Sequence, residues 1–128
     1  METLEIESTE RTPGIKFDYD QHYFEINGEA YPENSDEFFR PIMESLQEYS
    51  GLGFSETMTF VFKLIYFNSS SARVFMKLFE LLDEMAEERS VEIEWHYHEE
   101  DDTMEEFGEE FAEDMEYASF QLKSHNYG

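Results

Sequence analysis

The chain has 128 residues, of which 8 are Lys or Arg and 32 are Asp or Glu, giving a formal net charge of −24. This charge excludes nucleic acids and anionic membranes as partners, because their phosphates are repelled, and it favours a protein partner with a basic face. Hydrophobic residues make up 40% of the chain and aromatic residues 17%, which is too apolar for a disordered acidic chain, so we expect one globular domain over residues 1–128.

The first part of the chain predicts strands joined by turns. Residues 4–6 are a short candidate strand, and Pro13-Gly14 marks a turn, since proline fixes φ and glycine permits positive φ. Apolar and polar residues then alternate over 15–18 and 23–27 with a short polar connection between them, which predicts a β-hairpin.

A helix is predicted to follow the segment 31–35 and to end at Gly51-Leu52-Gly53, because apolar residues recur at helical spacing between them. Asn34 or Ser35 is the expected N-cap, and Glu37 completes a capping box with Asn34. Pro41 removes one hydrogen bond from the helix interior, so we expect either a bend there or a helix that becomes regular only after it.

The second half of the chain alternates strands with helices. Residues 58–67 are apolar on both faces except for Thr59 and Lys63, which predicts a central strand covered on both sides. A helix is expected over 71–88 with Ser70 or Ser71 as its N-cap. The remaining expected elements are a strand over 91–97 with clean alternation, an acidic loop over 99–102, a helix with apolar residues at 104, 107, 111 and 115, a strand over 118–122, and a fraying tail over 124–128.

The predicted order is β-β-β-α-β-α-β-α-β, which implies an α/β fold with helices packed on a mixed sheet. The chain has no cysteine, which excludes disulfides and thiol catalysis. Its acidic N-terminus lacks the apolar run of a signal peptide, and the apolar stretch at 60–67 is too short to span a membrane, so we expect a cytoplasmic protein. The absence of a glycine-rich phosphate loop, a nucleophile elbow or a kinase signature favours a binding module without a cofactor over an enzyme.

The most informative feature is the segment Asn68-Ser69-Ser70-Ser71, which joins the strand over 58–67 to the next helix. In open α/β sheets, function gathers where strands end and helices begin, and free N–H groups at a helix N-terminus favour negative charge. A phosphate on one of these serines would add roughly −1.5 to −2 charges to a neutral segment, a change suited to a switch. The alternative is an ordinary serine N-cap without modification.

Two other patterns lead to competing hypotheses. His96 and His98 share one face of a strand and lie beside an acidic loop, so a metal-dependent enzyme is one alternative. Their spacing fits neither a zinc protease nor an EF-hand, a solvated polar face explains the same residues, and we assign no metal ligand. The acidic helix over 104–115 offers the other alternative, a decoy that blocks a basic surface and is not regulated by phosphorylation.

Several motifs, in order along the chain, resemble the SiaC family of bacterial regulatory phosphoproteins. They are Thr12-Pro13-x-Ile15, Gly28-Glu-Ala-Tyr31-Pro32-Glu33-Asn34, Tyr66-Phe67-Asn68-Ser69-Ser70-Ser71, Trp95-His-Tyr97, and the acidic segment Met104-Glu-Glu-Phe-Gly108-Glu-Glu-Phe111. Each motif is weak alone, but their order and spacing cover nearly the whole chain and make the combined match specific.

The resemblance implies a STAS-like fold, of the kind found in anti-sigma-factor antagonists, and a partner-switching function. In such a system a Ser/Thr kinase phosphorylates one hydroxyl of the central segment and a PP2C-type phosphatase removes the phosphate. The unphosphorylated form binds an effector, such as a diguanylate cyclase that promotes biofilm formation. Carried onto this sequence, the acceptor falls on Ser69, where a family member has threonine, with Ser70 and Ser71 as alternatives. The partner-binding surface that we expect at this edge of the sheet comprises Tyr31, Pro32, Glu33, Asn34, Asn68, Ser69, Ser70, Ser71 and Arg73.

Overall fold

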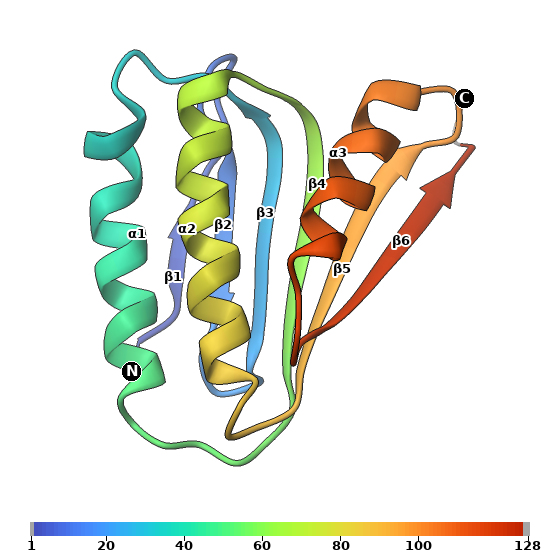
Figure 1. Ribbon diagram of the computed structural model, residues 1–128. Helices are drawn as coiled ribbons and strands as arrows, with labels where there is room; N and C mark the ends of the chain where they lie inside the picture. The colour runs from blue at the N-terminus through green and yellow to red at the C-terminus, as the bar shows by residue number, and fades with distance from the viewer. Residues whose placement is uncertain (1, 127–128) are drawn as a thin grey trace.

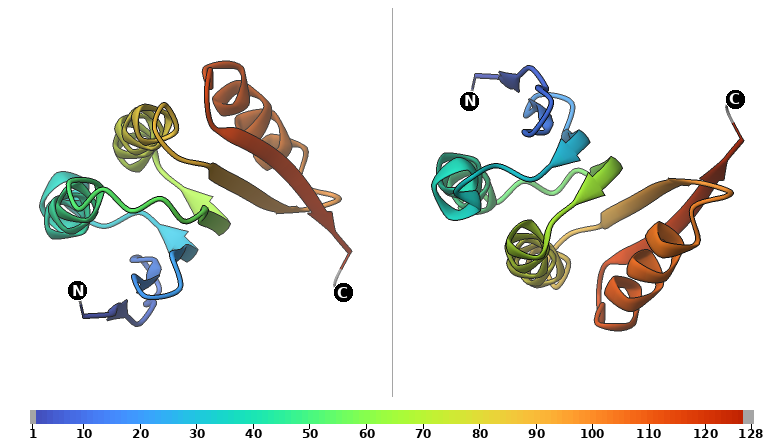
Figure 2. Two further views of the ribbon diagram at one scale, coloured as in Figure 1. Left: turned by 90° about the horizontal axis from the view of Figure 1, so that it is seen from below. Right: turned by 90° about the horizontal axis from the view of Figure 1, so that it is seen from above.

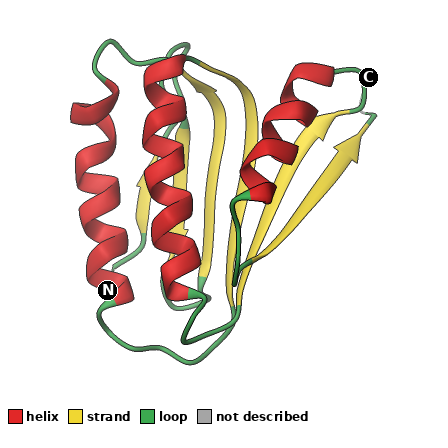
Figure 3. Cartoon of the chain, viewed as in Figure 1, coloured by secondary structure: helices red, strands yellow, loops and turns green. Residues whose placement is uncertain are grey.

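The structure, a computed structural model, describes residues 2–126 (Figure 1). Its elements follow the predicted order, and Figure 3 shows the three helices and the strands by colour. Their bounds are β1 Leu4–Ile6, β2 Gly14–Asp18, β3 Tyr23–Ala30, α1 Ser35–Ser50, β4 Met58–Phe67, α2 Ser69–Met85, β5 Val91–His98, α3 Asp102–Glu113 and β6 Ser119–His125. The predicted α/β class, a mixed sheet with helices packed on it, is therefore confirmed. Among the described residues no helix has both the length and the apolar character needed to cross a membrane.

The six strands form one sheet in which spatial order equals chain order. The pairs β1–β2 and β2–β3 are antiparallel, whereas β3, β4, β5 and β6 run parallel to one another. Each helical crossover moves one strand further in the same direction, and right-handed crossovers then place every helix on the same face of the sheet. Figure 2 shows α1, α2 and α3 together on one side.

The prediction that residues 58–67 are covered on both sides by other elements is wrong. One face of β4 packs on the helices and buries Phe60 and Phe62, but the other face has no helical layer. Thr59, Val61 and Lys63 alternate onto this open face. Val61 is only 2% exposed because neighbouring side chains of the open face cover it, so its apolar character does not report a second layer of helices.

The core lies between the sheet and the helices and is built largely from aromatic rings. Phe62 of β4 stands at its centre, with the rings of Phe60, Phe75, Phe79 and Trp95 at centroid distances between 4.9 and 5.9 Å. Most of these contacts are edge-on or tilted, the arrangement that aromatic quadrupoles favour. The helices enter this core through the apolar faces that their periodicity predicted.

The N-terminus of α1 has the predicted cap. The Asn34 side chain accepts a hydrogen bond from the Glu37 N–H at 3.0 Å. The helix is regular from Ser35, so the expectation that it becomes regular only after Pro41 is wrong. Pro41 removes a single N–H bond, and burial of Phe39 and Ile42 on either side of it holds the helix together.

At their carboxyl ends the central strands separate. The β4–β5 ladder ends at the pair Phe62 and Trp95, whereas β5 continues to pair with β6 as far as His98. This pairing carries β6 through Ser124 and His125, so the predicted strand was too short and the fraying expected there is wrong. In the rest of the expected fraying tail, Asn126 is exposed and follows the end of β6, and residues 127–128 lie outside the described residues.

Candidate functional site

The carboxyl ends of the parallel strands and the N-termini of all three helices lie at one edge of the sheet, the upper edge in Figure 1. This follows from the topology, because each parallel strand is followed by a helix that runs back in the opposite direction. The serine segment lies at the middle of this edge, between β4 and α2. Such an edge is where open α/β sheets place their binding sites.

Asn68 holds the serine segment in place. Its side-chain oxygen accepts hydrogen bonds from the Ser71 N–H at 2.9 Å and from the Ser70 hydroxyl at 3.1 Å, and its own N–H donates to the Ala30 carbonyl at 3.1 Å. The predicted N-caps, Ser70 and Ser71, and the predicted helix start at residue 71 are therefore wrong. Asn68 is the cap, and the three serines form the first turn of α2 rather than a loop.

The three serine hydroxyls have different surroundings. Ser69, the first residue of α2, is exposed. Ser70 is half-buried, and its hydroxyl contacts that of Ser35 at 2.8 Å. Ser71 has 0% of its surface exposed and contacts the same Ser35 hydroxyl at 3.1 Å. Only Ser69 presents its hydroxyl freely to an enzyme from solution.

Ser35 directly follows the predicted partner-binding residues 31–34, and its hydrogen bonds connect this segment to Ser70 and Ser71. Tyr31 packs its ring edge-on against Tyr66 at 5.6 Å, and Pro32 is buried. Glu33 is exposed and pairs with Arg11 at 3.2 Å. The start of α1 and the start of α2 thus form one continuous surface. Arg73 is exposed on α2, four residues and about one helical turn after Ser69.

Comparison with known proteins identifies the family of the chain. Residues 6–125 match the model of the SiaC family of regulatory phosphoproteins. The chain belongs to this family. The resemblance inferred from the motifs is thereby confirmed, and the match spans every strand and helix except the first residues of β1.

Relatives of this SiaC-family chain come from Pseudomonas aeruginosa. The uncharacterised protein PA14_02130 of strain UCBPP-PA14 is 31% identical over 127 residues, which is 98% of this chain and 99% of the relative. The crystal structure of the diguanylate cyclase SiaD in complex with its activator SiaC matches with a TM-score of 0.89 at 30% identity, over 95% of this chain and 99% of that one. A structure of SiaC of the same species matches with a TM-score of 0.85 at 30% identity, over 98% and 100% of the two chains.

His96, His98 and His125 of the SiaC-family chain lie on the open sheet face, and His96 and His125 form a hydrogen-bonded group there with Glu94. His96 contacts His125 at 2.6 Å through Nδ1 and Glu94 at 2.9 Å through Nε2. His98, on the same face, accepts a hydrogen bond from the Glu100 N–H at 3.1 Å. His96 is partly buried in this group rather than solvated. Within residues 2–126 no three His, Asp or Glu side chains are placed to hold a metal ion, so the structure lends no support to the metal-dependent enzyme.

A second polar group on the open face surrounds Glu25. Burial alone would raise the pKa of Glu25, but hydrogen bonds from Tyr23 at 2.7 Å and Asn27 at 2.8 Å, with Lys63 at 3.6 Å, hold it below its ordinary value. Burial and the same carboxylate raise the pKa of Tyr23. These side chains satisfy one another, which explains how a sheet face without a helical layer remains ordered.

Sequence reasoning missed an apolar hollow between the end of β4 and the start of α3. Ile65 and Tyr66, at the end of β4, are 69% and 52% exposed. They border a hollow of about 280 Å³ whose opposite wall is the start of α3, with Met104 and Phe107. The apolar run over 58–67 contains the residues that signal this hollow, but the same run also predicts a strand covered on both faces. The register slips by one residue at Ile65, because Gly28 pairs with Leu64 and Glu29 with Tyr66.

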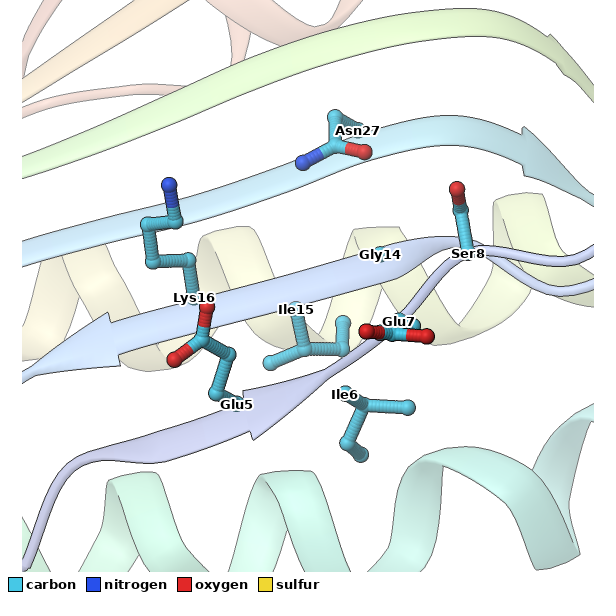
Figure 4. Close-up of a pocket in the computed structure, with 8 residues that line it drawn as sticks. All are labelled: Glu5, Ile6, Glu7, Ser8, Gly14, Ile15, Lys16 and Asn27. Carbon is cyan, nitrogen blue, oxygen red and sulfur yellow. The ribbon is translucent and has the colours of Figure 1, made fainter.

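A separate depression of about 340 Å³ lies between β1 and β2 (Figure 4). Glu5 and Glu7 flank it from the β1 segment, and Lys16 stands on β2. None of its lining residues belongs to the serine junction. We assign it no function.

Proposed function

We propose that this protein is a non-catalytic partner-switching regulator in which Ser69 is reversibly phosphorylated, and that the unphosphorylated form binds and activates a diguanylate cyclase. Membership of a family of regulatory phosphoproteins supports the regulatory role. The SiaC relative, an activator found in complex with the diguanylate cyclase SiaD, supports the kind of effector. The observation that carries the proposal is the exposure of Ser69 beside two hydroxyls that are engaged in hydrogen bonds.

The chemistry of the switch follows from the position of Ser69. A phosphate there lies at the N-terminus of α2, where free N–H groups and the helix dipole favour negative charge, and Arg73 is about one turn away. The fold therefore tolerates the modification. A partner that docks flush on this edge must remove water from a group carrying roughly −1.5 to −2 charges, and this cost weakens binding unless the partner supplies a cation.

The remaining parts of the proposal concern partners and location. A Ser/Thr kinase adds the phosphate and a PP2C-type phosphatase removes it. Ser70 and Ser71 position the acceptor rather than receiving the phosphate. Because the kinase uses ATP and a diguanylate cyclase uses GTP, the proposal places the protein in the cytoplasm. The proposed docking surface includes Tyr31, Glu33, Asn34, Asn68 and Arg73, whereas Pro32 is buried and supports this surface from beneath.

The test compares three forms of the full chain, which are the wild type, Ser69→Ala and Ser69→Asp. Each form is immobilised and exposed to lysate of the source organism, and captured proteins are quantified by mass spectrometry. We expect a diguanylate cyclase to be enriched at least tenfold on Ser69→Ala over Ser69→Asp. The purified cyclase should then make more product with Ser69→Ala than with Ser69→Asp. Equal capture, or equal activation, contradicts the proposal.

The acceptor is tested separately by mass spectrometry of the protein isolated from cells. Phosphate is expected on Ser69 and lost in Ser69→Ala. Phosphate found only on other residues, Ser70 and Ser71 included, contradicts the assignment. The decoy hypothesis makes the opposite prediction, because binding through the acidic face of α3 depends steeply on salt and ignores Ser69.

A further inference from the structure

The hollow between β4 and α3 has the features of a docking surface. It is lined on one side by Ile65, Tyr66 and Phe67 and on the other by Met104 and Phe107. Large apolar side chains that are at least half exposed are few among residues 2–126, and Ile65 and Tyr66 are consecutive members of that set. Two such neighbours on the wall of a concave site are typical of a surface that a partner covers.

The rim of the hollow is acidic. Asp101 lines it directly, and the loop and first turn that lead into α3 carry Glu99, Glu100, Asp102 and Glu105. No Lys or Arg occurs anywhere from residue 90 to residue 122. The negative charge on the α3 side therefore has no local compensation, and a basic segment is its complement.

The backbone beside the hollow is an unpaired strand edge. The β4–β5 ladder ends at Phe62, and within the described part of the chain no other strand takes the place of β5 along residues 64–67. Figure 1 shows β5 turning away from β4 toward this edge of the sheet. An unpaired edge of this kind accepts an extended peptide as an added strand.

We propose that the hollow binds an extended segment of a partner protein in which an apolar residue is flanked by Lys or Arg. The apolar side chain fills the space between Ile65 and Phe107, the basic side chains meet the carboxylates of the α3 side, and the segment's backbone pairs with residues 64–67. This inference rests on the proposed function in one respect: if that function is correct, the partner that supplies the segment is the effector. The hollow's preference for such a segment is independent of Ser69, which lies on α2 rather than on the α3 side.

The probe is the peptide KRVLVKR, acetylated and amidated, titrated into the full chain and followed by NMR of the Ile65 methyl group and of backbone amides. We expect a dissociation constant below about 1 mM with shifts at Ile65, Phe67 and Phe107. Peptide EEVLVEE, with reversed charge, and peptide KRVSVKR, without the anchor, should each bind at least tenfold more weakly. Two further peptides carry N-methyl groups on every second backbone amide, and the two patterns are offset by one residue. Only the pattern that methylates the amides facing β4 should weaken binding.

Ile65→Asp provides the decisive variant, since Ile65 is exposed and its replacement leaves the core intact. It should weaken KRVLVKR binding at least tenfold. Leu52→Asp is the matched control, because Leu52 is also exposed, at 53%, but lies in the loop after α1 at the opposite edge; it should leave binding unchanged. Binding that is equal in both variants, with shifts spread over the acidic surface, shows non-specific charge attraction and overturns the inference, as does the absence of binding at 1 mM peptide.

The same titration separates this inference from the proposed function. Ser69→Asp is expected to retain peptide binding while losing the effector. If the peptide fills the hollow but Ser69 has no influence on any effector, the docking surface is supported and the proposed switch is contradicted. If Ser69 controls an effector that Ile65→Asp still binds normally, the proposed switch is supported and the docking surface is contradicted.

Discussion

Replacing Gly108 with alanine tests how closely α3 packs on the sheet. Gly108 is buried on the face of α3 that meets Trp95. A Cβ atom at this position would lie 2.5 Å from Cδ1 and 3.1 Å from Cγ of the indole. Carbon atoms in contact are normally about 3.5–4.0 Å apart, so the indole or the helix has to move by about 1 Å. Trp95 is only 1% exposed and its Nε1–H donates to the Met104 carbonyl at 3.0 Å, so it has no free direction in which to move.

Two opposing contributions determine the size of the effect. Alanine favours a helix over glycine by about 1 kcal/mol. Overpacking of a buried site costs about 1–3 kcal/mol, and a broken hydrogen bond from the indole adds about 1–3 kcal/mol. We therefore expect Gly108→Ala to lower the free energy of unfolding by about 1–5 kcal/mol, with the upper part of this range reached only if the indole hydrogen bond breaks. Each kcal/mol corresponds to a fall in Tm of roughly 3–5 °C for a chain of this size.

The assay is urea unfolding followed by the fluorescence of Trp95, the single tryptophan of the chain. Gly51→Ala is the matched control, because its added Cβ would meet only the Glu48 and Gln47 carbonyls at the ordinary distances of 3.5 and 3.8 Å. That variant should be neutral or more stable by up to about 1 kcal/mol, since alanine reduces the entropy of the unfolded chain. A Gly108→Ala protein as stable as the wild type would refute the packing argument.

Three further comparisons test the serine junction and, near the C-terminal end of α2, the hydrogen bonds of Asp83 to the segment before β6. Asn68→Ala removes the acceptor of two hydrogen bonds and should cost about 1–2 kcal/mol in urea unfolding, more than Asn34→Ala; equal losses contradict the double role of Asn68. Ser71→Ala removes a buried, bonded hydroxyl and should cost about 1 kcal/mol, whereas Ser69→Ala should change the Tm little; the reverse order contradicts the assigned exposures. Burial would raise the pKa of Asp83, but three backbone N–H donors lower it, so its contribution to stability is complete above pH about 4 and is lost as pH falls through its folded value. Urea unfolding from pH 3 to 7 should show the difference between wild type and Asp83→Asn shrinking toward low pH, and a constant difference contradicts this.

Much of the fold was predictable because the pattern of apolar residues is local. Alternation over 91–97 gave the two faces of β5, and helical spacing gave the buried faces of α1 and α2. The error over 58–67 has a physical cause. Val61 is buried between its cross-strand partners Glu25 and Glu94, and Ile65 is an exposed bulge residue, so apolar residues occur on the second face of β4 without a second layer of helices. A pattern within one strand does not reveal which neighbours cover it.

The strand–helix junction was predicted in position but not in its internal arrangement. The strand–helix junction is visible in the sequence because four small polar residues follow an apolar run. Which residue caps the helix depends on the geometry of Asn68, whose N–H bonds to β3, and this long-range contact leaves no local signal. The contact between Ser35 and Ser71 joins residues that are 36 positions apart, so the distinct roles of the serines could not be inferred from their identical chemistry.

The arrangement of the serines is compatible with the proposed switch and would let it operate without a change of fold. Ser70, Ser71 and Ser35 are held by hydrogen bonds that join α1 to α2, and Asn68 ties the same turn to β3. Ser69 is attached to this support but contributes no bond to it among the described residues, so a phosphate can be added without breaking any of these contacts. The modification then changes the charge of the surface while the edge beneath it keeps its shape. In the proposed switch the protein acts by what it presents to a partner, so we expect the free energy of unfolding to be nearly indifferent to Ser69 and partner binding to depend on it.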